Sequence, residues 1–192
     1  YSAERKSVPL KELIARLDGR VYSFPANIGG LFPFILQSGH NNFTTGLQQI
    51  AFSREAGGAL ALELVEGEYK HRFMLKEDCY TSARLSQRGD VFEARFSVQT
   101  EISQTGELSL HIAAHFIETP FTRIIHMTLS GEDTLKVVFD EAPSIRDASE
   151  MLMELTGITR VEIVRNMLPL LKQERMQHTL RTFTTVTVQG KL

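Results

Sequence analysis

A two-residue alternation of apolar and polar side chains runs through the middle of this chain. The clearest example is residues 91–99, in which Phe92, Ala94, Phe96 and Val98 alternate with Glu93, Arg95, Ser97 and Gln99. Successive side chains of a β-strand point to opposite faces, so a run of this kind has one buried face and one face in water. The alternation therefore predicts antiparallel β-structure over residues 20–140.

Eight alternating runs follow one another in this region, with Gly, Asn, Asp and Ser residues between them. They are residues 47–53, 59–65, 69–75, 80–86, 91–99, 108–116, 123–129 and 135–139. Gly67, Gly89, Gly106 and Gly131 lie in the predicted turns. Many short strands with short connections favour a barrel, because closure removes exposed strand edges. We expect an antiparallel meander that closes into a lipocalin-like barrel.

Helical periodicity precedes and follows the strands. Over residues 7–18, apolar side chains recur at the spacing of one helical face, with Ser7 as a candidate N-cap and Gly19 at the end. Residues 144–178 predict two helices, the first opened by a capping pair of Ser144 and Asp147. The second begins at Thr159, and residues 181–188 follow as a closing strand. The class is mainly β with helices at both ends.

The composition fits one soluble domain over residues 1–192. A hydrophobic content of 42% supports one substantial core. The net charge of −2 and the pI near 6.3 argue against nucleic acid as a partner. The chain contains no run of about 18 apolar residues, so the sequence does not predict insertion into a membrane. The one cysteine, Cys79, forms no internal disulfide and leaves the compartment open between the cytoplasm and a bacterial cell exterior.

Signatures of serine catalysis do not occur in the sequence. No serine has a lysine three residues later, and the chain contains no Gly-x-Ser-x-Gly, Lys-Thr-Gly or Tyr-x-Asn sequence. The pairs Gly29-Gly30 and Gly57-Gly58 belong to no phosphate-binding fingerprint, so we interpret them as turns or bulges. We predict no catalytic residue and no cofactor in this chain.

Histidines are the most reactive group that the pattern brings together. His111 and His115 are four residues apart on one predicted strand, His126 is on the next, and His71 lies elsewhere in the sheet. Three histidines can bind zinc, which makes His111, His115 and His126 candidate metal ligands. The segment from His111 to His115 lacks the glutamate of a helical His-Glu-x-x-His site. Histidines on a half-polar strand face are therefore the preferred interpretation.

Other reactive side chains have simple structural interpretations. Cys79 stands between an aspartate and a tyrosine, a setting that disfavours a reactive thiolate. Glu63, Glu66 and Glu68 surround the turn at Gly67, so we expect them at a solvated hairpin tip rather than in a catalytic carboxylate group. A set of basic residues lies near the second C-terminal helix, diluted by glutamates, and indicates a solvated face: Arg160, Arg165, Lys172, Arg175 and Arg181.

Two segments resemble a known domain. Residues 19–31 (GRVYSFPANIGGL) resemble the opening strand of the C-terminal domain attached to many bacterial β-lactamase-like serine hydrolases, with its glycine, tyrosine, asparagine and glycine at Gly19, Tyr22, Asn27 and Gly29. Residues 107–111, 116–121 and 124–131 look like that domain's late strand pair and its Thr-Pro turn. The tryptophan usual before this second pattern does not occur here.

The resemblance implies a non-catalytic accessory domain that packs on, or shapes the cleft of, a catalytic hydrolase domain in the same parent polypeptide. The acyl-serine machinery would then lie upstream of this chain, as a first residue other than methionine also suggests. A lipocalin-like module with a cavity for an apolar small molecule is the alternative. A metal-dependent enzyme that uses His111, His115 and His126 is a further one. A filled interior would favour the accessory domain, and an empty apolar cavity would favour the lipocalin-like module.

Overall fold

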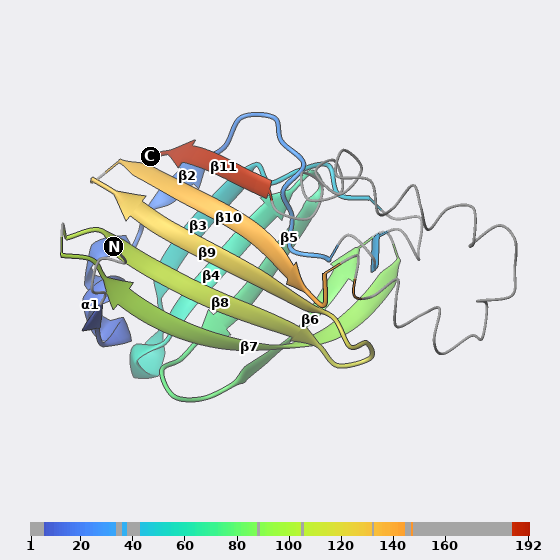
Figure 1. Ribbon diagram of the computed structural model, residues 1–192, viewed down its shortest axis with the longest axis horizontal. Helices are drawn as coiled ribbons and strands as arrows, with labels where there is room; N and C mark the ends of the chain where they lie inside the picture. Colours follow the sequence, from blue (N-terminus) through green and yellow to red (C-terminus); the bar gives the residue numbers. More distant parts are fainter. Residues whose placement is uncertain are drawn as a thin grey trace, which may run out of the picture.

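The computed structural model shows a strongly curled antiparallel β-sheet, with helix α1 (Leu10–Leu17) at one end (Figure 1). It describes residues 6–33, 36–37, 43–87, 89–104, 106–131, 133–144, 147 and 186–192. The strands in these ranges are β1 (Lys6–Ser7), β2 (Val21–Ser23), β3 (Gln49–Arg54), β4 (Leu60–Glu66), β5 (Tyr69–Leu75), β6 (Thr81–Gln87), β7 (Asp90–Ile102), β8 (Leu108–Phe116), β9 (Thr122–Ser130), β10 (Thr134–Ala142) and β11 (Val186–Lys191). A 3₁₀ turn, η1 (Ala56–Gly58), joins β3 to β4. The mainly β prediction is confirmed.

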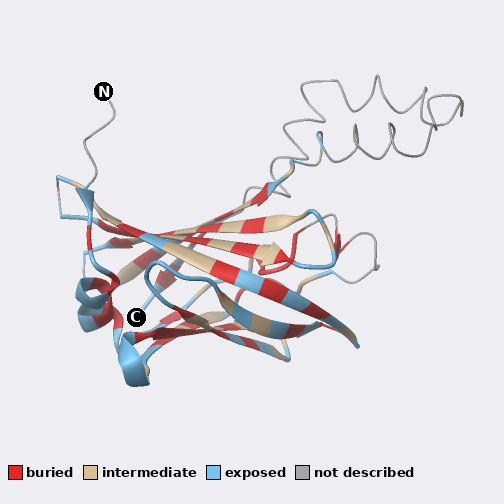
Figure 2. Cartoon of the chain, turned by 90° about the horizontal axis from the view of Figure 1, so that it is seen from below, coloured by how far each residue is buried: buried red, intermediate tan, exposed pale blue. Residues whose placement is uncertain are grey.

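The alternation of side chains translates directly into burial (Figure 2). Along β8 and β9, every second residue is buried and the residues between them are half-buried or exposed, apart from Ser109, which is also buried. All strand pairs are antiparallel, and the register places Ile112 opposite Val98 on one side and Ile125 on the other. Each of the eight predicted runs overlaps a strand. The four turn glycines, Gly67, Gly89, Gly106 and Gly131, all have positive φ, as tight turns require.

The described strands form a strongly curled half-barrel, and their ladder does not close into the lipocalin-like barrel that the sequence predicts. The strand order is β1-β7-β8-β9-β10-β11-β2-β3-β4-β5, and β6 also pairs with β7. The edge strand β5 has no ladder with β6 or β7, but Phe73 of β5 stacks on Phe96 of β7 at 3.9 Å between ring centroids. The Thr81 hydroxyl of β6 donates to the Met74 carbonyl of β5. Side chains therefore complete the enclosure that the backbone ladder leaves open.

Helix α1 (Leu10–Leu17) covers one end of the curled sheet. Its buried face is Leu10, Leu13, Ile14 and Leu17, as the spacing predicts. Leu13 and Leu17 pack among inward side chains of four strands: Phe52, Leu108, Leu110, Met127, Leu129 and Leu135. The space left among them is about 10 Å³, room for about one water molecule. This end is therefore closed by packed aliphatic side chains.

The predicted start of this helix was wrong. Ser7 belongs to β1, opposite Glu101 of β7, and the N-cap position is Pro9, whose side chain makes no cap hydrogen bond. Proline suits the start of a helix because its missing N–H would have no helical partner. At the other end, Gly19 has φ of 75° and donates its N–H to the Phe52 carbonyl, 3.0 Å away, so the predicted termination is confirmed.

The C-terminal predictions fall mostly on residues outside the described ranges. The two helices expected over 144–178 lie there, except for residues 144 and 147. At this point the Asp147 backbone N–H donates to Ser144 Oγ over 3.3 Å, and the Ser144 hydroxyl donates to the Asp147 carboxylate over 2.7 Å. The expected capping pair is thus present. Strand β11 overlaps the predicted closing strand at residues 186–188 and continues to Lys191, while residues 181–185 lie outside the described ranges; it pairs with β10 and reaches β2 through Lys191 and Ser23.

Candidate functional site

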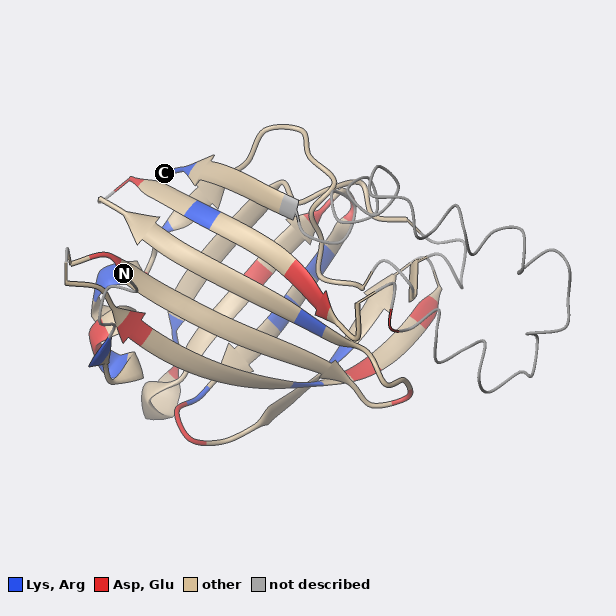
Figure 3. Cartoon of the chain, viewed as in Figure 1, with Lys and Arg blue, Asp and Glu red and all other residues tan. Residues whose placement is uncertain are grey.

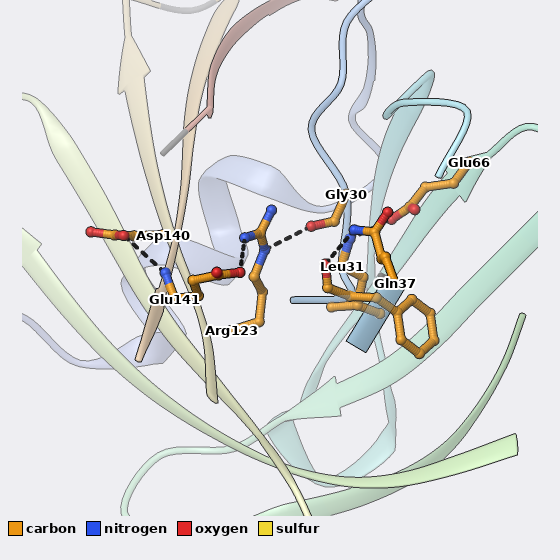
Figure 4. Close-up of polar contacts among 8 residues, drawn as sticks. Gly30, Leu31, Gln37, Glu66, Arg123, Asp140 and Glu141 are labelled. Atoms are coloured by element: carbon orange, nitrogen blue, oxygen red, sulfur yellow. Dashed lines mark hydrogen bonds and ion pairs between the residues drawn. The ribbon is translucent and has the colours of Figure 1, made fainter. Parts of the chain in front are cut away.

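A buried charged cluster lies at the end of the sheet opposite α1 (Figure 4). It contains Arg123 at the start of β9, Glu141 near the end of β10 and Glu66 at the end of β4, each 2–6% exposed. All three occupy positions at which the strand alternation points inward. Arg123 is the single Asp, Glu, Lys or Arg residue in β9, and β8 has none (Figure 3). A charge at such a position needs partners inside the protein.

Arg123 joins the sheet to the segment between β2 and β3. The structure describes residues 24–33, 36–37 and 43–48 of this segment, and we call these residues the plug loop. Arg123 donates from Nε to the Gly30 carbonyl over 2.9 Å, and its Nη1 lies 3.4 Å from Glu141 Oε2. The guanidinium carbon also lies 5.1 Å from the centre of the Phe139 ring. Burial lowers the pKa of Arg123 to about 10, against the opposing effect of Glu141, Glu66 and Asp140. The side chain therefore remains a cation at neutral pH.

Glu66 holds the plug loop from the other side. Its Oε1 accepts the Leu31 backbone N–H at 2.6 Å, and its Oε2 accepts the Thr44 hydroxyl at 2.7 Å. Desolvation raises the pKa of Glu66, while these two hydrogen bonds and the charge of Arg123 oppose the rise. Two donors directed at one carboxylate are typical of a structural anchor.

The expectation of a solvated hairpin tip was therefore wrong for Glu66. Glu63 and Glu68 behave differently: the Glu63 carboxylate is 33% exposed and lies 3.9 Å from the Lys70 ammonium, and Glu68 is exposed. Glu66 is in phase with Leu62 and Leu64, whose side chains are buried. The inward phase of the strand thus continues to its last residue, which proximity to a turn does not reveal.

The plug loop closes on itself by further hydrogen bonds. Asn27 Nδ2 donates to the Leu47 carbonyl at 2.7 Å, and its Oδ1 accepts from Leu47 N at 3.1 Å. Gln37 Nε2 donates to the Phe32 carbonyl at 2.7 Å, and its Oε1 accepts from Thr44 N at 2.8 Å. These side chains replace the strand partners that the loop backbone lacks.

Close packing explains the pair Gly29-Gly30. A Cβ atom at Gly30 would lie 2.8 Å from Glu66 Oε2, and one at Gly29 would lie 2.8 Å from the Phe139 ring. Only glycine lets the loop backbone approach the buried carboxylate and this ring so closely. The interpretation of Gly29-Gly30 as a mere turn therefore missed its role in seating the plug loop.

The plug loop carries Phe32 into the interior. This ring is 1% exposed and meets Phe92 at 5.4 Å, Phe116 at 5.5 Å and His71 at 5.4 Å between centroids. These partners come from β5, β7 and β8. Phe32 thus fills the interior at the end that α1 does not cover.

His71 is an interior residue next to Phe32. It is 2% exposed, and its ring also stacks on Tyr69 with centroids 6.4 Å apart. Burial lowers its pKa to about 4, so the imidazole is neutral at pH 7. Its Nε2 has no hydrogen-bond partner among the described residues. A neutral imidazole can pack among aromatic rings as an apolar side chain would. Protonation of His71 would place a charge in this buried site and destabilise the fold.

The three candidate metal ligands share the outer face of the sheet. His111 and His126 are directly opposite in register, and their Nδ1 atoms lie within hydrogen-bonding distance. His115 is separate: its Nδ1 lies 3.0 Å from the Thr122 hydroxyl, and its ring lies near Tyr80. Within the described ranges no three His, Cys, Asp or Glu residues cluster as metal ligands. The structure thus brings two of the three candidates together.

The remaining predictions concern the surface and the C-terminal region. Cys79 is exposed. The basic residues Arg160, Arg165, Lys172, Arg175 and Arg181 lie outside the described residues. In the part of the chain that the structure describes, no helix is long and apolar enough to cross a bilayer.

Sequence reasoning missed the buried cluster, although a signal for it exists. Arg123 is in phase with Ile125 and Met127, and Glu141 is in phase with Val137 and Phe139. A charged residue on the apolar phase of a strand indicates either the end of that strand or a buried partner.

Comparison with family models, with curated proteins and with solved structures finds no match to this chain.

Proposed function

We propose that this chain is a non-catalytic accessory domain of a β-lactamase-like serine hydrolase, which packs on or shapes the cleft of a separate catalytic domain. The observation that carries the proposal is the filled interior. Phe32, Phe92 and Phe116 meet at the centre of one end, and Phe73 stacks on Phe96 further along. An interior packed with aromatic rings suits a scaffold rather than a container.

The charged groups inside the domain support the same role. Glu66, Arg123 and Glu141 are buried, and the partners described above are protein atoms of the plug loop and the sheet. A general acid or base must reach a substrate proton, either directly or through one water molecule. Side chains occupied in holding a loop serve structure, and the acyl-serine chemistry of the parent would come from another domain.

The two resembling segments lie near each other in the fold. Residues 19–31 contain β2 and the first part of the plug loop, including Asn27, Gly29 and Gly30. Residues 107–111, 116–121 and 124–131 belong to the hairpin of β8 and β9 and to the turn between them, which includes Thr119 and Pro120. Arg123 lies beside this second segment, outside the resembling residues, and donates to the Gly30 carbonyl of the first.

A fluorescent β-lactam tests the proposal, because it acylates the active serine of such hydrolases. The upstream reading frame is first read for a Ser-x-x-Lys sequence. We then expect the full-length product to become covalently labelled and residues 1–192 alone to remain unlabelled. Serine-to-alanine substitution in the upstream motif is the matched control and should abolish the label. Labelling of residues 1–192 alone, or a frame with no hydrolase domain, would contradict the proposal.

A further inference from the structure

A histidine pair occupies the centre of the outer sheet face. His111 of β8 and His126 of β9 are directly opposite in register, and their rings lie 4.7 Å apart between centroids at an angle of 75°. Both side chains are half-buried, and that of His111 is 23% exposed. Ladders to β7 and β10 hold the two strands on either side. Two imidazole nitrogens thus face each other from a rigid support at a surface that water reaches.

A carboxylate lies beside one member of this pair. Glu101 Oε2, from β7, lies 3.4 Å from His111 Nε2, which is an ion-pair distance without hydrogen-bond geometry. The negative charge of an ionised carboxylate favours the tautomer of His111 that carries its proton on Nε2. The lone pair of His111 is then on Nδ1, directed at His126. Metal-binding histidines commonly use one ring nitrogen as ligand and donate the other N–H to a carboxylate.

We propose that His111 and His126 form a chelate site for a divalent transition-metal ion, with Glu101 as the residue that positions His111. A metal ion 2.0–2.1 Å from each nitrogen needs the two Nδ1 atoms about 3 Å apart, which small side-chain rotations provide. The ion replaces the proton that the two nitrogens share; His126 loses this proton from Nδ1 and takes one up from solvent on Nε2, so both rings bind the metal ion as neutral imidazoles. Imidazole ligands select Cu(II), Ni(II) and Zn(II) over Mg(II) and Ca(II), with Cu(II) bound most tightly.

The chain contains its own control for this site. His115 projects from the same strand and the same face, but it interacts with Thr122 and Tyr80 rather than with another histidine. Exposed Cys79 is a competing metal ligand, and Cys79→Ser removes it from every protein compared. Differences between variants in this background then report on the histidine pair alone.

Cu(II) chloride is titrated into the Cys79→Ser protein and followed by calorimetry and electron paramagnetic resonance. We expect a Cu(II) site whose spectrum shows coupling to two nitrogens. Glu101→Ala should weaken it about tenfold or more, as loss of an outer-shell carboxylate does. His111→Ala and His126→Ala each remove a ligand and should weaken it at least as much. His115→Ala should leave the affinity within about twofold, and Mg(II) should not compete.

Variants His111→Gln and His126→Gln repeat the test with a polar side chain, and circular dichroism confirms that each variant is folded. Equal Cu(II) affinity in the starting protein and in the folded His111 and His126 variants would overturn the proposal. A spectrum without coupling to two nitrogens would also overturn it, as would a loss of binding confined to His115→Ala.

Discussion

Arg123 joins parts of the structure that are distant along the chain. It is 2% exposed, and its guanidinium links Glu141 of β10 to the Gly30 carbonyl of the plug loop. A buried ion pair is not strongly stabilising in itself, because both ions lose their hydration. Substitution of only one partner is strongly destabilising, because the charge of the other partner then stays buried without compensation.

We expect Arg123→Met to lower the free energy of unfolding by about 3–5 kcal/mol, measured by urea denaturation at pH 7. The double variant Arg123→Met, Glu141→Leu removes the charge left behind and should recover part of that loss. Arg95→Met, on the exposed face of β7, is the control and should change stability by less than about 0.5 kcal/mol. A loss below about 1 kcal/mol for Arg123→Met would show that Arg123 does not anchor the loop.

His71 makes stability depend on pH. The pKa of His71 is about 4 in the folded protein and 6.5 in the unfolded chain. Between pH 6.5 and pH 4, His71 is therefore protonated in the unfolded chain and neutral in the folded protein. Its stabilising contribution is complete above pH 6.5 and decreases as the pH falls toward 4. The difference in pKa corresponds to about 3 kcal/mol in total.

The variant His71→Phe removes this titration and keeps an aromatic ring beside Phe32. We expect the difference in unfolding free energy between His71→Phe and the unmodified protein to shift by about 2–3 kcal/mol in favour of the variant between pH 7 and pH 4. Glu66 and all other carboxyl groups are common to both proteins, so their titration cancels in the comparison. A difference that stays constant with pH would contradict a buried neutral His71.

At the scale of elements, the strands could be predicted from the sequence and the plug loop could not. Strands β4 to β10 follow from alternation because one face of each is packed and the other is wet. The loop has no periodicity. Its position depends on pairs that are distant along the chain, such as Arg123 with Gly30 and Glu66 with Leu31. Local patterns contain no information about which carbonyl a buried arginine will meet.

The candidate site was predictable to a similar degree. Strand phase brings His111 and His126 to one face, and it would also have identified Arg123 and Glu141 as inward charges. Strand order and register decide the rest: His126 lies opposite His111, whereas His115 lies opposite Thr122. A shift of register by two residues would pair different side chains, and the turn at 117–121 sets that register.

Phe32 is the element-scale test of the plug loop. We expect Phe32→Ala to lower the unfolding free energy by about 3–5 kcal/mol, because it opens a cavity among Phe92, Phe116 and His71. The Leu31 backbone N–H donates a hydrogen bond to Glu66, and its hydrogen exchange should also become faster in this variant. Ile28→Ala, an exposed position of the same loop, is the control and should have little effect. Equal stability of the two variants would mean that the loop rests on the sheet without closing it.

At the scale of the whole molecule, the curled sheet is closed at both ends by non-strand segments. Helix α1 places Leu13 and Leu17 at one end, and the plug loop places Phe32 at the other. Between them, Phe73 and Phe96 stack across the gap in the ladder. The apolar side chains inside the sheet thus form a packed core. This is the basis for proposing a scaffold rather than a carrier of an apolar small molecule.

The most direct measurement of this claim is a titration with an apolar ligand, observed at interior methyl groups. Leu31 precedes Phe32 in the chain, and Leu64 lies opposite His71, whose ring contacts Phe32; both are buried, and their methyl groups serve as reporters in NMR spectra. A packed interior predicts that benzene leaves these resonances unchanged in the unmodified protein and shifts them saturably in Phe32→Ala, whose cavity accepts it. Saturable shifts of the same methyl groups in the unmodified protein would contradict the account and identify the domain as a ligand carrier.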